Sequence, residues 1–249
     1  MRVSGCIPTD NCPVDWEEMT PSDEIEAADW IGPRLHPFAQ DVGSVVPSGF
    51  EAYARIFHPA WRLAGAHQVE MRWSDVAAWT GRVVHPEMQF HSIAAPLPGG
   101  ETRVRGFSAE PWLGALSEGQ ARALVELLAR HTSTPDACWF GVWEGYGTFK
   151  TRPKSKRVSL PGRNYFLFRG PLSLAPGHLD GPNLWWPDDH TWCVASEIDF
   201  PYTYVGGTKE LIEEILADPS LEALPANLDH GITAYSDTVN AGGFTGFEE

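Results

Sequence analysis

Residues 117–143 read SEGQARALVELLARHTSTPDACWFGVW and carry the strongest structural signals in the chain. Ser117 and Gln120 have the spacing of a capping box, in which the two side chains satisfy each other's backbone amides at a helix N-terminus. The apolar positions that follow have the spacing of one helical face: Ala121, Leu124, Val125 and Leu128. This pattern predicts a helix over 118–130. Residues 138–143 are apolar on both faces, which is typical of a central strand.

Two further segments of the C-terminal half have strand character. Residues 163–169 (RNYFLFR) are rich in aromatic side chains. Residues 191–200 alternate, so that Trp192 and Ile198 share one face while Glu197 and Asp199 share the other. Helices precede and follow these strands without a regular βαβ repeat. The sequence therefore predicts an α+β fold with a mostly antiparallel sheet in the C-terminal half and helices packed on it.

Shorter patterns predict the remaining helices. A first helix is expected over 23–31 and a short one over 74–79, capped by Ser74. Ser48 and Glu51 fit a second capping box, and apolar residues follow at helical spacing: Phe50, Tyr53, Ala54 and Phe57. Thr208 is expected to cap a last helix that ends before Pro219, and the TYVGG stretch before it is typical of a glycine turn.

The composition bounds the function class. We expect residues 1–22 to form an extended N-terminal arm and residues 23–249 to form a single α+β domain. The net charge of −15 makes nucleic-acid binding an unfavourable interpretation, because a basic face supplies most of that affinity. Neither a signal peptide nor an 18-residue apolar run is present, so we expect a cytoplasmic protein without a membrane span. Cys138 and Cys193 are expected to be buried, and whether Cys6 and Cys12 pair stays open.

Several segments, above all WWPDD, EIDF and TYVGG, resemble an uncharacterised family of bacterial cytosolic proteins. The resemblance runs from about Trp30 to Asn240 and implies no activity and no site residues. A weaker likeness, carried by a short helix after Val46-Pro47 and by the later aromatic strands, is to the SMI1/KNR4-like (SUKH) proteins. Many members of that family are immunity proteins that bind toxins, so the likeness implies a binding module.

Glu197 and Asp199 are the candidate catalytic pair. Residues two apart on a strand share a face, and two neighbouring carboxylates can divide the roles of acid and base. Glu144 could join them, as could Asp188, Asp189 and His190 in the loop before the strand. The alternative is a structural role, in which these carboxylates pair with Arg163 and Arg169 across the sheet.

The other candidates are binding residues. Trp185 and Trp186, followed by Asp188 and Asp189, lie between two prolines and could stack on a ligand or belong to the core. Residues 145–179 carry seven basic and no acidic residues, so the remainder of the chain carries −22. The loop part of this segment could bind an acidic protein partner or a second copy of the chain, or be balanced locally: Lys150, Arg152, Lys154, Lys156 and Arg157.

No recognised cofactor or metal motif is present, so we expect no cofactor and no metal site. His85, Glu87 and His91 have no metal-site order that we can name, and a structural role is the favoured interpretation. Two functions stay open. The first is a non-catalytic binding or protein-interaction domain, with an immunity-type module as one form. The second is a hydrolase-like enzyme built on Glu197 and Asp199.

Overall fold

A nine-stranded sheet organises the protein, and every strand pairing within its described residues is antiparallel. The computed structural model describes residues 19–65, 67–94, 109–146, 149, 152–177 and 182–240. Along the sheet the strands follow the order β1-β7-β5-β8-β9-β10-β2-β11, and β6 also pairs with β7. The strands span β1 Thr20–Ser22, β2 Ala52–Phe57, β5 Cys138–Trp143, β6 Arg157–Leu160, β7 Arg163–Gly170, β8 Leu184–Pro187, β9 Cys193–Ala195, β10 Tyr202–Gly207 and β11 Ala223–Ala226.

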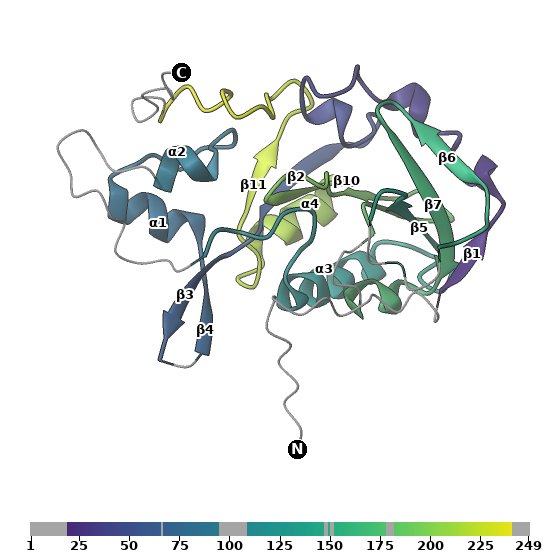
Figure 1. The fold of residues 1–249 in the computed structure, drawn as a ribbon, viewed down its shortest axis with the longest axis horizontal. Coiled ribbons are helices and arrows are strands. Elements are labelled where there is room, and N and C mark those ends of the chain that lie inside the picture. Colours follow the sequence, from purple (N-terminus) through teal and green to yellow (C-terminus); the bar gives the residue numbers. More distant parts are fainter. Residues whose placement is uncertain are drawn as a thin grey trace.

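Helices and turns cover both faces of this sheet (Figure 1). One face packs against α3 (Glu118–Arg130), α4 (Lys209–Ala217) and the 3-10 helix Leu172–Gly177. The other packs against α1 (Trp73–Thr80), α2 (Phe90–Ala94) and the first 3-10 helices. Those 3-10 helices are η2 (Ile25–Ala28), η3 (Gly32–Arg34) and η4 (Val42–Ser44). The expected α+β fold, with helices packed on a mostly antiparallel sheet, is confirmed.

A separate hairpin extends from one end of the molecule (Figure 1). Strands β3 (Ala60–Ala64) and β4 (His67–Met71) form a two-stranded sheet of their own, and Trp61 of β3 also forms an isolated β-bridge with Ala109. Apart from Ala60, Trp61 and Met71, the side chains of both strands are exposed. The hairpin is anchored at its base, where Trp61 lies against Trp112 with ring centroids 4.8 Å apart.

The helix and strand of residues 117–143 form as their sequence predicts. Helix α3 begins with the complete Ser117–Gln120 capping box and ends at Arg130. Its buried face includes Leu124 and Leu127, while Val125 is only half-buried. Strand β5 lies between β7 and β8, so its two faces enter two different cores, Trp139 on one side and Phe140 on the other. The predicted helix after Thr208 is also confirmed, with the Thr208 hydroxyl accepting the amide of Leu211.

The helix predicted after Ser48 is wrong. Residues 52–57 form strand β2, which pairs with β10 on one side and β11 on the other. Tyr53, Arg55 and Phe57 enter one core and Ala54 and Ile56 the other, so the run is buried on both faces. A short apolar run of this kind also satisfies helical spacing, and periodicity alone cannot separate the two. Glu51 does cap a helix, but that helix is α4, whose Lys209 amide donates to its carboxylate.

The glycine turn predicted at residues 204–208 is also wrong. Residues 202–207 form β10, a buried strand between β9 and β2. Gly206 is needed there because a β-carbon at this position would lie 2.6 Å from the Phe50 ring and 2.8 Å from that of Tyr53. The small residue lets two aromatic rings pack directly on the strand backbone.

Three smaller predictions change. The helix expected over 23–31 shortens to the 3-10 helix Ile25–Ala28, and a second 3-10 helix, Gly32–Arg34, follows where the predicted helix was to end. Helix α1 begins after Arg72 rather than Ser74, and the Glu222 carboxylate accepts the amides of Trp73 and Ser74 in place of a serine cap. Of the predicted arm, residues 1–18 lie outside the described residues and residues 20–22 pair with β7 as β1. None of the described helices combines the length and apolarity that crossing a bilayer requires.

Candidate functional site

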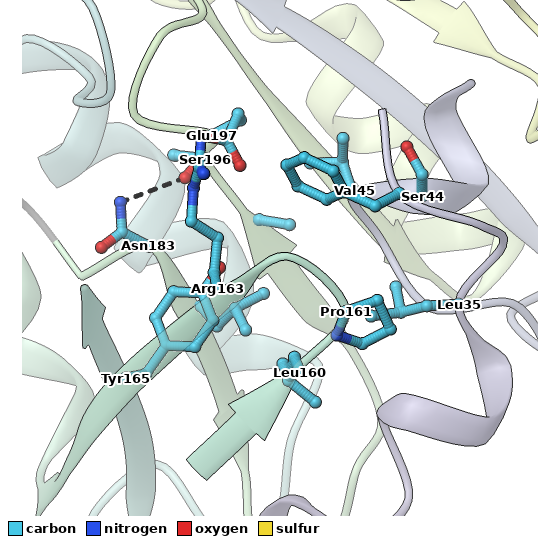
Figure 2. Close-up of a pocket in the computed structure, with 13 residues that line it drawn as sticks. Leu35, Ser44, Val45, Leu160, Pro161, Arg163, Tyr165, Asn183, Ser196 and Glu197 are labelled. Atoms are coloured by element: carbon cyan, nitrogen blue, oxygen red, sulfur yellow. Dashed lines mark hydrogen bonds and ion pairs between the residues drawn. The ribbon is translucent and has the colours of Figure 1, made fainter. Parts of the chain in front are cut away.

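A small pocket lies where the segment 35–45 crosses the sheet beside the turn between β6 and β7 (Figure 2). Its apolar wall consists of Leu35, Phe38, Val45, Leu160, Pro161, Leu184 and Ala195. Its polar groups are Ser44, Arg163, Tyr165, Asn183, Ser196 and Glu197. The centre of a water molecule can occupy only about 20 Å³ of this space, which is room for roughly one water.

Arg163 dominates the polar side of the pocket. Its Nη2 donates to Glu197 Oε1 at 2.7 Å, its Nε donates to the same oxygen at 3.2 Å, and Asp199 Oδ2 lies 3.4 Å away. The rings of Phe38 and Trp143 lie 5.2 and 5.7 Å from the guanidinium carbon. Burial opposes the charge, but the bonds to Glu197 outweigh it and raise the pKa of Arg163. The arginine is thus held in its charged form against both candidate carboxylates.

Glu197 and Asp199 do not share a strand face. The predicted strand 191–200 is wrong outside residues 193–195, because β9 spans only Cys193–Ala195 and the chain then turns, with the Phe200 amide donating to the Glu197 carbonyl. The Glu197 side chain is 12% exposed and that of Asp199 is 71% exposed, so the two occupy different environments. Trp192 is fully buried as predicted, whereas Ile198 is only half-buried. The arrangement is that of a salt bridge at the pocket rim.

Glu144, which directly follows β5, is also paired with arginine side chains. Its carboxylate accepts from Arg157, from Arg152 at 3.2 Å and from Asn164 Nδ2 at 2.8 Å. The Arg157 bond is the main cause that lowers the pKa of Glu144. Two of the five basic loop residues therefore balance a carboxylate of this same chain. Lys154 and Lys156 are exposed, and Lys150 lies outside the described residues.

Asp188 and Asp189 are occupied by structural hydrogen bonds. Asp188 accepts from Trp139 Nε1 at 2.5 Å and from Arg169 at 2.8 Å. Asp189 accepts from the hydroxyls of Thr132, Ser133 and Thr191 and from the Ser133 amide. Burial alone would raise the pKa of Asp189, but the Ser133 bonds and the others lower it to about 2. The Asp188 carboxylate thus fastens the β8–β9 turn to β5 and β7, and the Asp189 carboxylate fastens it to the segment that follows α3.

The aromatic residues around this turn are covered. Trp185 is 3% exposed and Trp186 is 1% exposed, and they lie on opposite faces of β8. His190 has a positive φ of 54° and stacks on Trp30, with centroids 4.7 Å apart. Burial is the main cause that lowers the pKa of His190. A ligand that stacked on Trp185 or Trp186 would have to displace the residues that cover these rings. His190 is not among the residues that line the Arg163 pocket.

A buried hydrogen-bond chain behind the pocket was not predicted from the sequence. His58 Nδ1 lies 2.7 Å from the Trp112 carbonyl, His58 Nε2 lies 2.9 Å from Thr203 Oγ1, and Thr203 Oγ1 lies 2.7 Å from Ser196 Oγ. Burial lowers the pKa of His58 to about 4, so the ring is neutral near pH 7. Nδ1 therefore carries the proton that the carbonyl accepts, Thr203 donates to Nε2, and Ser196 donates to Thr203. In this series of hydrogen bonds the Ser196 hydroxyl donates its proton to Thr203. The bonds also hold the end of β9 against β10.

The His85, Glu87 and His91 motif has a structural role. His85 Nε2 lies 2.8 Å from Asp237 Oδ1, the Glu87 carboxylate accepts the Gly231 amide, and His91 Nε2 lies 3.0 Å from the Ala234 carbonyl. All three contacts fasten the C-terminal segment to the α2 region. Cys138 and Cys193 are buried as predicted, and burial raises the pKa of the Cys138 thiol to about 12 and that of Cys193 further. Cys6 and Cys12 lie outside the described residues.

A group of possible metal ligands lies elsewhere, on the outer side of the segment 35–45. His36, Asp41 and Asp229 each place one ligand atom within 4.8 Å of the others. Sequence spacing does not mark this group, because Asp229 lies far along the chain from His36 and Asp41. It is separate from the carboxylates that bind Arg163.

Four exposed apolar side chains lie on α1, on the loop that follows it and on the C-terminal segment that is hydrogen-bonded to this loop. We call this group the Val83 surface: Trp79, Val83, Val84 and Val239. The Val83 amide donates to Asn240 Oδ1 and Asn240 Nδ2 donates to the Val83 carbonyl, both at 3.0 Å, which holds Val239 beside Val83. Trp79 is 52% exposed, although tryptophan usually lies inside proteins. This surface was not predicted from the sequence. Its members come from a helix end and two loops, so they share no helical or strand periodicity.

No protein-family model, no curated protein and no solved structure matches this chain.

Proposed function

We propose that this protein is a non-catalytic protein-interaction domain that contacts its partner through the Val83 surface. The observation that carries the proposal is the exposure of Trp79 together with three neighbouring valines. Contiguous exposed apolar residues on a soluble domain mark interaction sites, and tryptophan is the side chain that most often dominates binding energy. An apolar protein surface is the partner chemistry that fits this group.

The arrangement of the candidate catalytic residues supports the same proposal. Glu197 and Asp199 both face Arg163, and Glu144 faces Arg152 and Arg157. A general acid or base must reach a substrate proton, and the adjoining pocket has room for roughly one water. The alternative, a hydrolase-like enzyme built on Glu197 and Asp199, would require Arg163 to leave both carboxylates.

The basic loop is the weaker candidate surface. Arg152 and Arg157 bind Glu144, so only Lys154 and Lys156 of the described loop residues offer charge to an acidic partner or a second copy. The loop adjoins β6, which lies at the opposite end of the molecule from α1 (Figure 1). One small partner would therefore not cover both surfaces. An immunity-type module, which the SMI1/KNR4 likeness implies, is one form of the interaction domain that we propose.

Site-specific photocrosslinking tests this proposal. A benzoylphenylalanine replaces Trp79 in one variant and Glu126, an exposed residue of α3, in a second variant that serves as the control. In the cell that naturally makes the chain, we expect residue 79 to give one protein adduct of defined mass and residue 126 to give none. Equal adducts at both positions, or no adduct at residue 79, would contradict the proposal.

A further inference from the structure

We propose that His36, Asp41 and Asp229 bind a divalent transition-metal ion, which clasps the segment 35–45 to the turn after β11. The three ligand atoms lie within 4.8 Å of one another. One imidazole nitrogen with two carboxylate oxygens is a donor set suited to Zn²⁺ or Mn²⁺. The proposal is independent of the Val83 surface, because it uses other residues of the fold.

Backbone hydrogen bonds hold the two ligand-bearing segments together. The Val42 amide donates to the His230 carbonyl and the Gly43 amide to the Leu228 carbonyl, both at 2.9 Å. Asp41 also forms an isolated β-bridge with Gly231. His36 and Asp41 on one segment are therefore fixed beside Asp229 on the other before any ion arrives.

The individual side chains are also positioned. The His36 amide donates to the Gly43 carbonyl at 2.8 Å, and a β-carbon at Gly43 would lie 2.5 Å from His36 Nδ1. The missing side chain thus lets the imidazole lie directly against the backbone of residue 43. The Asp41 carboxylate accepts the Ser44 amide at 3.1 Å, which orients it without using all of its lone pairs.

The distances suit ligation. His36 Nδ1 lies 3.0 Å from both oxygens of Asp41. Two neighbouring ligands that lie about 2.1 Å from an ion are separated by about 3.0 Å in octahedral geometry and by about 3.4 Å in tetrahedral geometry. An ion can therefore enter between imidazole and carboxylate after small side-chain shifts, with Asp229 supplying the third ligand and water the rest.

The charges favour a cation. Asp41 and Asp229 bring two carboxylates together, and neither is paired with Lys or Arg within the described part of the chain. No bond of the Asp229 carboxylate to another described side chain is seen, and its backbone amide is the group that bonds, to Asn227 Oδ1. This differs from Glu144, Glu197 and Asp188, which all have arginine partners.

Metal binding would act on the pocket region. Leu35, Phe38, Ser44 and Val45 line the Arg163 pocket and belong to the same segment as His36 and Asp41. Asp229 follows β11, an edge strand of the sheet. The ion would therefore fix one pocket wall to the sheet edge, a structural role that a stability measurement can detect.

Calorimetric titration of the untagged full chain with Zn²⁺ tests the proposal, with Mg²⁺ as the hard-ion comparison. We expect 1:1 Zn²⁺ binding that weakens by about tenfold or more in both His36→Gln and Asp229→Asn, since each loses a ligand. Asp29→Asn removes one charge from an exposed aspartate outside the cluster and should bind Zn²⁺ like the wild type. Zn²⁺ should also raise the melting temperature of the wild type but not of Asp229→Asn, because an ion that binds only the folded state stabilises it.

Circular dichroism first confirms that the variants fold. The absence of 1:1 Zn²⁺ binding to the wild type would overturn the proposal. So would unchanged Zn²⁺ affinity in either ligand variant, or a loss as large in Asp29→Asn, which would indicate general attraction of cations to an acidic protein.

Discussion

Arg163 donates from both Nε and Nη2 to a single oxygen of Glu197, at 3.2 and 2.7 Å. The arginine side chain is 21% exposed and the glutamate side chain is 12% exposed, so both are mostly buried. This bond joins the start of β7 to the turn that follows β9, and β7 and β9 are not neighbours in the sheet. It fixes the carboxylate that the sequence presents as the candidate acid or base.

The first prediction concerns this pair. Arg163→Ala should lower the free energy of unfolding by about 1–3 kcal/mol, because a charged hydrogen-bond partner is removed from a part-buried carboxylate. A double-mutant cycle with Glu197→Gln in urea melts should show a coupling energy of about 1 kcal/mol or more. The exposed pair Arg122–Glu118 serves as the control and should give about 0.5 kcal/mol or less. Equal coupling in both cycles would show that Arg163 and Glu197 do not form a structural bond.

The second prediction is a pH dependence that His58 causes. Burial lowers the pKa of His58 to about 4 in the folded state, against about 6.5 in the unfolded chain. The unfolded state therefore binds the proton first, so stability is complete above pH 6.5 and falls as the pH drops toward 4. The loss should reach about 3 kcal/mol at pH 4.

Denaturant melts between pH 7.5 and 4.5 check this prediction. The difference between wild type and His58→Gln should shrink as the pH falls, because the variant cannot take up the proton. His67→Gln, which removes an exposed histidine of β4, should leave the wild-type slope unchanged. A constant difference between wild type and His58→Gln would mean that His58 is not a buried neutral group.

The third prediction concerns α3. Leu124 is fully buried, so Leu124→Ala should cost about 2–5 kcal/mol as a core truncation. Val125 is its half-buried neighbour, so Val125→Ala should cost less. Urea melts compare the two. A loss below about 0.5 kcal/mol for Leu124→Ala would show that this helix face is not packed on the sheet.

The fourth prediction compares two glycines. In Gly206→Ala the new β-carbon would meet the rings of Phe50 and Tyr53, so the variant should lose about 1–3 kcal/mol. Gly119 lies in α3, where a β-carbon has only Ser117 Oγ nearby, at 4.0 Å. Gly119→Ala should therefore gain about 0.4–1 kcal/mol from helix propensity and chain entropy. Thermal melts that ranked the two variants in the opposite order would contradict the position of β10.

Local signals predicted the elements that carry them. The Ser117 box and the Thr208 cap satisfy amides within their own helices, so sequence spacing alone locates α3 and α4. The continuous apolar run of residues 138–143 identifies β5 because both of its faces are buried. These elements depend little on partners that are distant along the chain.

The missed elements depend on distant partners. Strand β2 has helical spacing in its sequence, but it is extended because β10 and β11 supply its hydrogen bonds. The glycines of β10 resemble a turn until the rings of Phe50 and Tyr53 are placed against them. The same limit applies to the candidate sites. The sequence left the Arg163–Glu197 bond open as the alternative to a catalytic pair, and the sheet decides for the bond. The Val83 surface does not follow from spacing, because the C-terminal segment brings Val239 beside Val83.

The fifth prediction tests the central claim that function resides in the Val83 surface and not in the carboxylates. The measurement is the affinity of purified chain for the protein captured at residue 79, compared among wild type, Trp79→Ala and Asp199→Asn. Asp199 is the more exposed of the two carboxylates, so its replacement should leave the fold intact. We expect Trp79→Ala to weaken binding by about tenfold or more, as loss of a tryptophan hot spot does, and Asp199→Asn to bind like the wild type. Full affinity in Trp79→Ala, or a comparable loss in Asp199→Asn, would contradict the claim.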